Sequence, residues 1–156
     1  MNAEYHVVAS IPIAASFYAA TGSFLTVAGV FLGGVLIDVD HLLEYWLDEG
    51  FNVRIKEFFA YGNQGGTSRF LFIFHSYEVI IILILCSFAL PVKAIIWSVI
   101  AGMSVHLVLD YINILNKLGY RWYSCIIFSF FFRLALGFRR DLIEKMVLPR
   151  SNRKEF

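Results

Sequence analysis

The sequence predicts an all-α fold: a multi-pass membrane bundle of about four to five hydrophobic helices, followed by a C-terminal amphipathic helix. Of the 156 residues, 59% are hydrophobic and only 16% are charged, whereas ordinary soluble domains are about 45–50% apolar and about 25% charged. The mean hydropathy is +0.70, and a long uncharged run extends from Val7 to Ile37. The chain length favours one domain over residues 1–156, and the composition favours an integral membrane protein.

The first uncharged run is too long for one comfortable membrane span. As a single helix, Val7 to Ile37 would be about 46 Å long, against a hydrocarbon core of about 30 Å. The sequence Thr21-Gly22-Ser23 interrupts the run and is typical of a turn. We therefore expect two helices, over roughly residues 6–20 and 24–45, that form a hairpin.

A polar connection over residues 46–74 follows this hairpin and contains a glycine cluster, which is typical of a loop. Within it, Phe51 to Tyr61 fits either a short surface helix or a loop with aromatic anchors. A second apolar hairpin is predicted after the connection. Its arms run over roughly residues 70–90 and 92–114, and Pro91 lies between them.

The end of the chain combines apolar and basic residues. The last apolar stretch runs from Trp122 to Phe138, and apolar residues at helical spacing continue to Val147. That pattern predicts an amphipathic helix on the membrane surface. The tail over residues 139–156 is strongly basic, which favours a cytoplasmic position because positive residues gather on that side of a membrane.

Ionisable side chains gather at the ends of the apolar segments. The sequence Asp38-Val39-Asp40-His41 ends the first run, and the pair His106 and Asp110 has the four-residue spacing that puts both on one helix face. Ionisable residues at such positions are expensive and are commonly functional. With the first run folded as a hairpin, all four histidines reach one membrane face. The predicted metal ligands are His6, Asp38, His41, His75, His106 and Asp110.

Each element also has a structural interpretation. A lone histidine such as His6 commonly caps a helix or lies at an interface, and His106 could simply be hydrogen-bonded to Asp110 across one turn. Asp38, Asp40 and His41 could be ordinary polar residues at a membrane boundary. One shared site explains the recurrence of histidine at segment ends better than separate structural roles do.

The ligand chemistry favours a divalent metal. Nitrogen and carboxylate ligands without cysteine suit zinc, with manganese or iron as alternatives, and the set is large enough for one or two ions. Such a metal lowers the pKa of its bound water to about 7, and Asp40 or Glu78 would then be the catalytic general base. The chain has no G-x-S-x-G nucleophile motif and no P-loop. Cys86 and Cys125 lie in apolar runs and are interpreted as packing residues.

Together these elements resemble the YdjM-like family of LexA-regulated inner-membrane proteins, which are regarded as metal-dependent hydrolases. That family has an early His, a Gly-rich helix ending in Asp-x-Asp-His, a His-Ser element and a late His-x-x-x-Asp. The corresponding residues here are His6, Gly33 to His41, His75-Ser76, and His106 to Asp110. The late element is also similar, more distantly, to one in zinc-dependent phospholipases C.

The chain departs from the family pattern at two places. Ile37 replaces the usual Pro before Asp-x-Asp-His, and Ile73-Phe74 replace the Thr and basic residue common before His-Ser. The resemblance implies a bacterial inner-membrane protein that hydrolyses its substrate with a bound metal.

We therefore expect a membrane-bound hydrolase that cleaves a phosphoester of a lipid or another membrane-resident substrate, with membrane lipids as partners and no nucleic acid. The alternative is a non-catalytic membrane protein that binds or transports a divalent metal or protons, since buried His and Asp also serve such relays.

Overall fold

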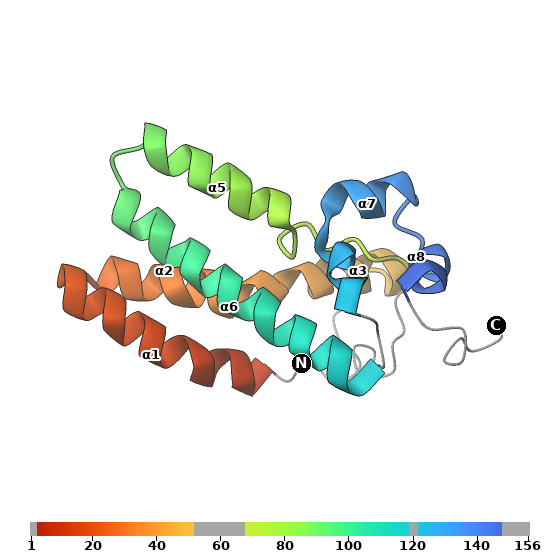
Figure 1. Cartoon of the computed structure of the whole chain (residues 1–156), viewed down its shortest axis with the longest axis horizontal. Coiled ribbons are helices and arrows are strands. Elements are labelled where there is room, and N and C mark those ends of the chain that lie inside the picture. The colour runs from red at the N-terminus through yellow and green to blue at the C-terminus, as the bar shows by residue number, and fades with distance from the viewer. Residues whose placement is uncertain (1–2, 52–67, 119–121, 148–156) are drawn as a thin grey trace.

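The computed structural model describes residues 3–51, 68–118 and 122–147, and this part of the chain is helical without a β-strand. Figure 1 shows the elements in chain order. They are α1 (Ala3–Thr21), α2 (Phe24–Gly34), the 3-10 helix η1 (Leu36–Asp38), α3 (Val39–Glu49), α5 (Tyr77–Ala89), α6 (Lys93–Leu118), the 3-10 helix η2 (Trp122–Phe128), α7 (Phe130–Ala135) and α8 (Arg140–Val147).

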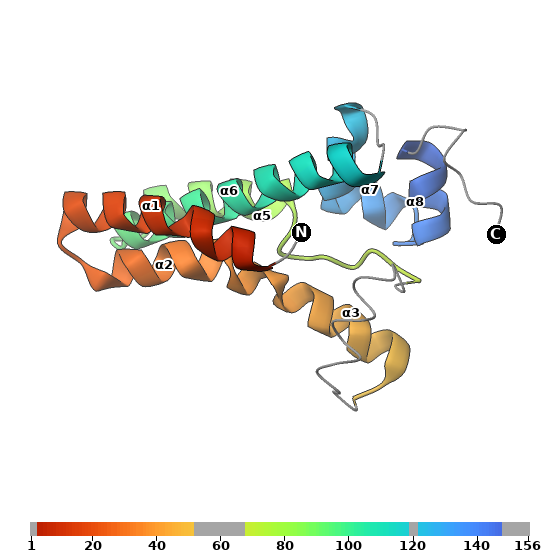
Figure 2. The same cartoon turned by 90° about the horizontal axis from the view of Figure 1, so that it is seen from below.

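The helices form two hairpins and a smaller group of short helices. The α1–α2 turn and the α5–α6 turn lie at the same end of the molecule, whereas α3, α7 and α8 lie at the other end (Figures 1 and 2). Helix α6 is the longest element and packs against α1, α2 and α5. The arrangement therefore brings the beginning of α1, the end of α2 and the second half of α6 toward the end that carries the short helices.

The first hairpin forms at the predicted turn. Gly22 has φ +64°, a left-handed conformation that favours glycine at a helix end, and its N–H donates to the Tyr18 carbonyl over 2.7 Å. Ser23 then begins α2 as its N-cap, because its side chain accepts a hydrogen bond from the Leu25 N–H. The prediction of a break at Thr21-Gly22-Ser23 is confirmed.

The second predicted helix does not continue to residue 45 without interruption. Helix α2 ends at Gly34, and the chain bends by 41° before η1 and α3. Val35 lies at the break with φ −130° and ψ −48°, outside the values of an α-helix. The bend matters for the site because it leaves the Gly34 carbonyl without an intrahelical partner and turns Asp38 toward α6.

Close packing of α2 on α6 depends on glycine. A Cβ added at Gly33 would lie 2.2 Å from the Val99 carbonyl oxygen, and a Cβ at Gly102 would lie 2.2 Å from that of Val30. Both contacts are with backbone atoms, which cannot move aside as a flexible side chain can. The two helix backbones therefore touch, and this contact sets the distance between the end of α2 and the second half of α6.

The first arm of the second hairpin and the last apolar stretch form shorter helices than predicted, whereas the second arm forms α6 and continues to Leu118. Helix α5 begins at Tyr77 rather than near residue 70, so residues 70–76 form a non-helical segment. The stretch Trp122 to Phe138 divides into η2 and α7. An amphipathic helix forms as α8, but its Ile143 and Val147 lie in a buried apolar cluster with residues of α6 and η2 rather than on a membrane surface. Residues 52–61 and the tail beyond 147 lie outside the described residues.

The predicted four to five membrane-crossing helices are not found. Among the described residues, only Lys93–Asn116 of α6 is long and apolar enough to cross a membrane, with mean hydropathy 1.7, and α2 with α3 would make a second span only as a bent pair. Helix α1 has the length but carries Glu4, His6 and Pro12, which reduce its hydropathy. Helix α5 has 13 residues, about 20 Å against the roughly 30 Å required.

Candidate metal centre

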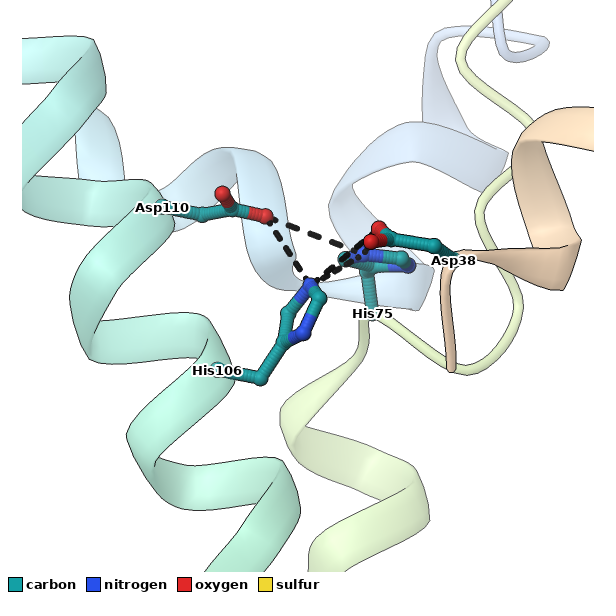
Figure 3. Close-up of side chains that lie close together, drawn as sticks. All are labelled: Asp38, His75, His106 and Asp110. Atoms are coloured by element: carbon teal, nitrogen blue, oxygen red, sulfur yellow. Dashed lines mark hydrogen bonds and ion pairs between the residues drawn. The ribbon is translucent and has the colours of Figure 1, made fainter. Parts of the chain in front are cut away.

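Four side chains from three parts of the fold converge at the end of the helical hairpins. Asp38 ends η1, His75 lies in the segment before α5, and His106 and Asp110 lie one turn apart on α6. Each offers one ligand atom, and these atoms all lie within 4.8 Å of one another. Figure 3 shows that the four side chains point toward one another. Spacing brings His106 and Asp110 together, whereas only the fold brings in Asp38 and His75.

The closest contacts centre on the Nε2 atom of His106. It lies 3.0 Å from Nε2 of His75, 3.2 Å from Oδ2 of Asp110 and 3.3 Å from Oδ1 of Asp38. Nε2 of His75 lies 3.4 Å from the same Asp38 oxygen. Two imidazole nitrogens and two carboxylate oxygens thus surround one small volume (Figure 3).

Hydrogen bonds behind the two imidazoles fix which ring nitrogen faces this volume. Nδ1 of His106 lies 2.9 Å from the Gly34 carbonyl oxygen, which can only accept a hydrogen bond, so Nδ1 carries the proton. Nδ1 of His75 lies 3.2 Å from Oδ2 of Asp40, and a carboxylate likewise only accepts. In the neutral form of each histidine, Nε2 therefore presents its lone pair to the other ligands.

The resulting volume is lined by acceptors, which repel one another unless a cation lies between them. Outer hydrogen bonds of this kind orient histidine ligands in metal sites. Burial opposes a positive charge on His75, but its contacts with Asp38 and Asp40 outweigh that effect and raise its pKa. The carboxylates thus favour positive charge at this point, and a divalent metal satisfies all four groups at once. The residues present fit such an ion.

One side of the cluster is open. His75 and His106 are buried, with 2% and 1% of their surface exposed, whereas the Asp38 side chain is 31% exposed. The His41 side chain beside it is 41% exposed, and its Nε2 lies 3.7 Å from Oδ1 of Asp38. Asp38 and His41 therefore form the solvent-exposed side of the cluster.

His6 and His41, the other two predicted ligands, adjoin the cluster without completing it. The His6 ring stacks on His106 with centroids 3.8 Å apart, and its Nε2 lies 3.3 Å from Oδ1 of Asp110. Asp110 thus faces His6 with one oxygen and His106 with the other. His41 lies at the open rim, so its ligand role stays a prediction.

Glu44 is a functional candidate that the sequence analysis missed. Its side chain is buried, Oε1 accepts a hydrogen bond from the Leu71 N–H, and Oε2 lies 3.5 Å from Nδ1 of His41. The available signal was its three-residue spacing from His41, which puts both on one face of α3. Glu44 contacts Nδ1 of His41, and Nε2 of His41 therefore faces Asp38.

The two predicted general bases have other partners in the structure. Oδ2 of Asp40 accepts hydrogen bonds from the backbone N–H groups of Phe74 (2.5 Å) and His75 (3.2 Å) as well as contacting the His75 ring. Asp40 therefore holds the segment that carries His75.

Glu78 instead accepts hydrogen bonds from Ser129 Oγ and from the N–H groups of Phe130 and Phe131 at the start of α7. Partial burial opposes its ionisation, but these bonds outweigh burial and lower its pKa. Its contacts are those of a helix cap, and the base role of Asp40 or Glu78 stays a prediction.

Asp40→Asn is expected to weaken binding of Co(II), a spectroscopic substitute for zinc, by about 10–100-fold, the usual effect of losing an outer partner of a metal ligand. The amide can donate to Nδ1 of His75 and so stabilise the tautomer whose Nε2 carries the proton. Titration of the visible Co(II) absorption measures the change. Asp141→Asn is the matched control, because Asp141 is exposed on α8 and pairs with Arg139. Equal affinities of Asp40→Asn and wild type would contradict this role of Asp40.

Comparisons of the chain with protein-family models, with curated proteins and with solved structures find no match. The geometry of the four side chains alone indicates that they could hold a metal.

Proposed function

We propose that the protein is a metal-dependent hydrolase that cleaves a phosphoester of a lipid or another membrane-resident substrate. One observation carries the proposal: His75 and His106, with their Nδ1 atoms engaged elsewhere, point their Nε2 atoms at each other and at Asp38. A bound divalent metal would lower the pKa of a water molecule to about 7 and polarise a phosphoryl oxygen. Zinc, manganese and iron all accept this set of nitrogen and oxygen ligands.

The open side of the cluster supports catalysis over a purely structural ion. Catalytic metal sites keep a position for water or substrate, and here the half-exposed Asp38 and His41 provide the approach. His41, oriented by Glu44, is placed to contact a substrate that enters there. Ser76, the nearest hydroxyl in sequence to a ligand, is buried and donates its hydrogen bond to the Phe72 carbonyl, so a serine nucleophile is not part of the proposal.

The exterior of the hairpins supports an apolar substrate. Large apolar side chains are exposed along α2, α5 and α6, among them Phe24, Leu25, Ile82, Leu85, Phe88 and Val108. An exposed apolar surface of this extent is typical of a site that meets a membrane or another apolar partner. Lipid molecules would thus lie beside the chain, and their phosphate groups would be within reach of a site at the end of the bundle.

The alternative function is metal binding without catalysis. Its support is the number of ligands, because four protein ligands are the usual complement of a closed, tetrahedral zinc site. Manganese or iron prefers further ligands and would leave positions for substrate. The metal content of the purified protein therefore bears directly on the choice.

The test of the proposal is hydrolysis of mixed phospholipids in nanodiscs by the purified protein supplied with zinc or manganese. We expect release of headgroups or diacylglycerol, and loss of that release in Asp38→Asn, because this change removes a charged ligand from the open side. Asp141→Asn is the control and should keep the wild-type rate. Protein that binds metal but releases nothing, while taking up metal into sealed vesicles, would favour the alternative.

A further inference from the structure

Three of the four ligands lie on helices, but His75 does not. It belongs to the non-helical segment over residues 70–76, so its position depends on contacts from outside that segment. On one side, α3 supplies them: Asp40 accepts hydrogen bonds from Phe74 and His75, and Glu44 accepts one from Leu71. The other side of the segment faces the C-terminal helices, and α7 supplies the contacts nearest His75 there.

Arg133 of α7 makes these contacts. Its side chain is fully buried, Nη2 donates a hydrogen bond to Oγ of Ser76, and the guanidinium lies 5.5 Å from the centre of the Phe72 ring. Ser76 directly follows His75. The Phe72 ring has its centroid 5.7 Å from the His75 ring and 4.9 Å from the His41 ring. Arg133 thus holds the residue after the ligand and the ring packed against it.

Helix α7 is itself anchored next to the ligand. Glu78, three residues after His75, accepts hydrogen bonds from the first N–H groups of α7, those of Phe130 and Phe131. The segment is also joined to the C-terminal part at its other end, where the Phe70 N–H donates to the Phe138 carbonyl over 2.9 Å. Glu78 therefore fixes the helix of Arg133 on one side of the His75 segment, and the Phe70–Phe138 hydrogen bond joins the other end of the segment to the chain just after that helix.

The charge of Arg133 indicates more than packing. Burial lowers its pKa to about 10, so the side chain stays protonated near neutral pH. Its Nε and Nη1 atoms have no hydrogen-bond partner among the described residues, and the charges of Glu78, Asp40 and Glu44 favour its protonated form. A buried cation with so few partners is costly, and an apolar side chain would fill the same space at lower cost.

We infer that Arg133 is a positioning residue for the metal ligand His75, which it holds in place through Ser76 and Phe72. The inference rests on the proposed metal site. The positive charge of Arg133 also offsets the negative charges of Asp40 and Glu44, which hold the same segment from α3. Removing Arg133 leaves Ser76 Oγ without this donor and the Phe72 ring without its cation, so His75 gains freedom to leave its position.

The experiment is a Co(II) titration of the full chain and its Arg133→Met variant, read from the visible absorption of the bound ion. We expect a 10–100-fold loss of affinity, as for other outer partners of metal ligands, and a change in the band shape that reports altered geometry. Arg139→Met is the matched control, because Arg139 is 62% exposed and pairs with Asp141. If Arg133→Met does not fold, Arg133→Lys, which keeps the charge but not the planar fork, is compared in the same way.

A second comparison separates positioning from general destabilisation. In a His75→Ala background, Arg133→Met should weaken Co(II) binding by less than about threefold, because its effect passes through His75. A loss of equal size with and without His75, or an unchanged affinity in a folded Arg133 variant, overturns the inference. Failure of the wild-type chain to bind Co(II) refutes the metal site itself, so the two failures are distinguishable.

Discussion

Replacement of His106 by Ala is expected to reduce zinc affinity by about a thousandfold. Structural zinc sites bind zinc with apparent free energies of about 10–16 kcal/mol. One of four ligands therefore accounts for up to about 4 kcal/mol, which corresponds to about a thousandfold change in the dissociation constant. The loss should be near the upper end because Nε2 of His106 is the atom with the most close contacts in the cluster. Competition with a chromophoric chelator measures the affinity.

His41→Ala is the matched control for His106→Ala. His41 is half-exposed and its nearest cluster atom is the Asp38 oxygen at 3.7 Å, so its removal should cost zinc affinity no more than about tenfold. Far-UV circular dichroism before titration checks that both variants keep their helices. If the two substitutions weakened zinc binding equally, the assignment of His106 to the inner ligands and His41 to the rim would be wrong.

Gly102→Val is expected to lower the free energy of unfolding by about 3 kcal/mol, at the upper end of the usual cost of overpacking. A Cβ at this position would lie 2.2 Å from the Val30 carbonyl oxygen and 2.8 Å from the Gly34 nitrogen. Helices α2 and α6 must then separate. The thermal midpoint should fall by about 6–12 °C for a chain of this size.

The same substitution should impair metal binding, because the Gly34 carbonyl holds Nδ1 of His106 across the α2–α6 contact. Ala94→Val is the control: it adds bulk at an exposed position of the same helix and should change the free energy of unfolding by no more than about 0.5 kcal/mol. Thermal unfolding of Gly102→Val within 2 °C of wild type would show that the two backbones are not in contact.

Local patterns in the sequence predicted several features correctly. The turn at Thr21-Gly22-Ser23 followed from its residue types, and the pairing of His106 with Asp110 followed from the helical period. The six side chains that the sequence selected as candidate metal ligands include all four of the clustered ones, because ionisable residues in apolar surroundings are rare enough to stand out. These predictions depend on residues close together in the chain.

The predicted number of membrane-crossing helices was wrong because local composition does not fix the length of each helix. Composition records how much apolar surface the chain has, but the length of each helix depends on where capping and breaks occur. The break at Val35 and the late start of α5 at Tyr77 shortened two of the predicted spans, and Gly33-Gly34 directly before Val35 was the one local signal of the first break. An apolar run is therefore no measure of a continuous helix.

The sequence by itself determined the helical class, the first turn and a set of six candidate ligands, because these follow from residue type and short-range spacing. Only the tertiary structure decided which ring nitrogens face the other clustered side chains, since that depends on the Gly34 carbonyl and Asp40, which are far in sequence from the histidines they orient. It also decided that Glu78 caps α7 and that Arg133 lies behind His75. Both contacts join residues more than fifty positions apart, and no local pattern carries that information.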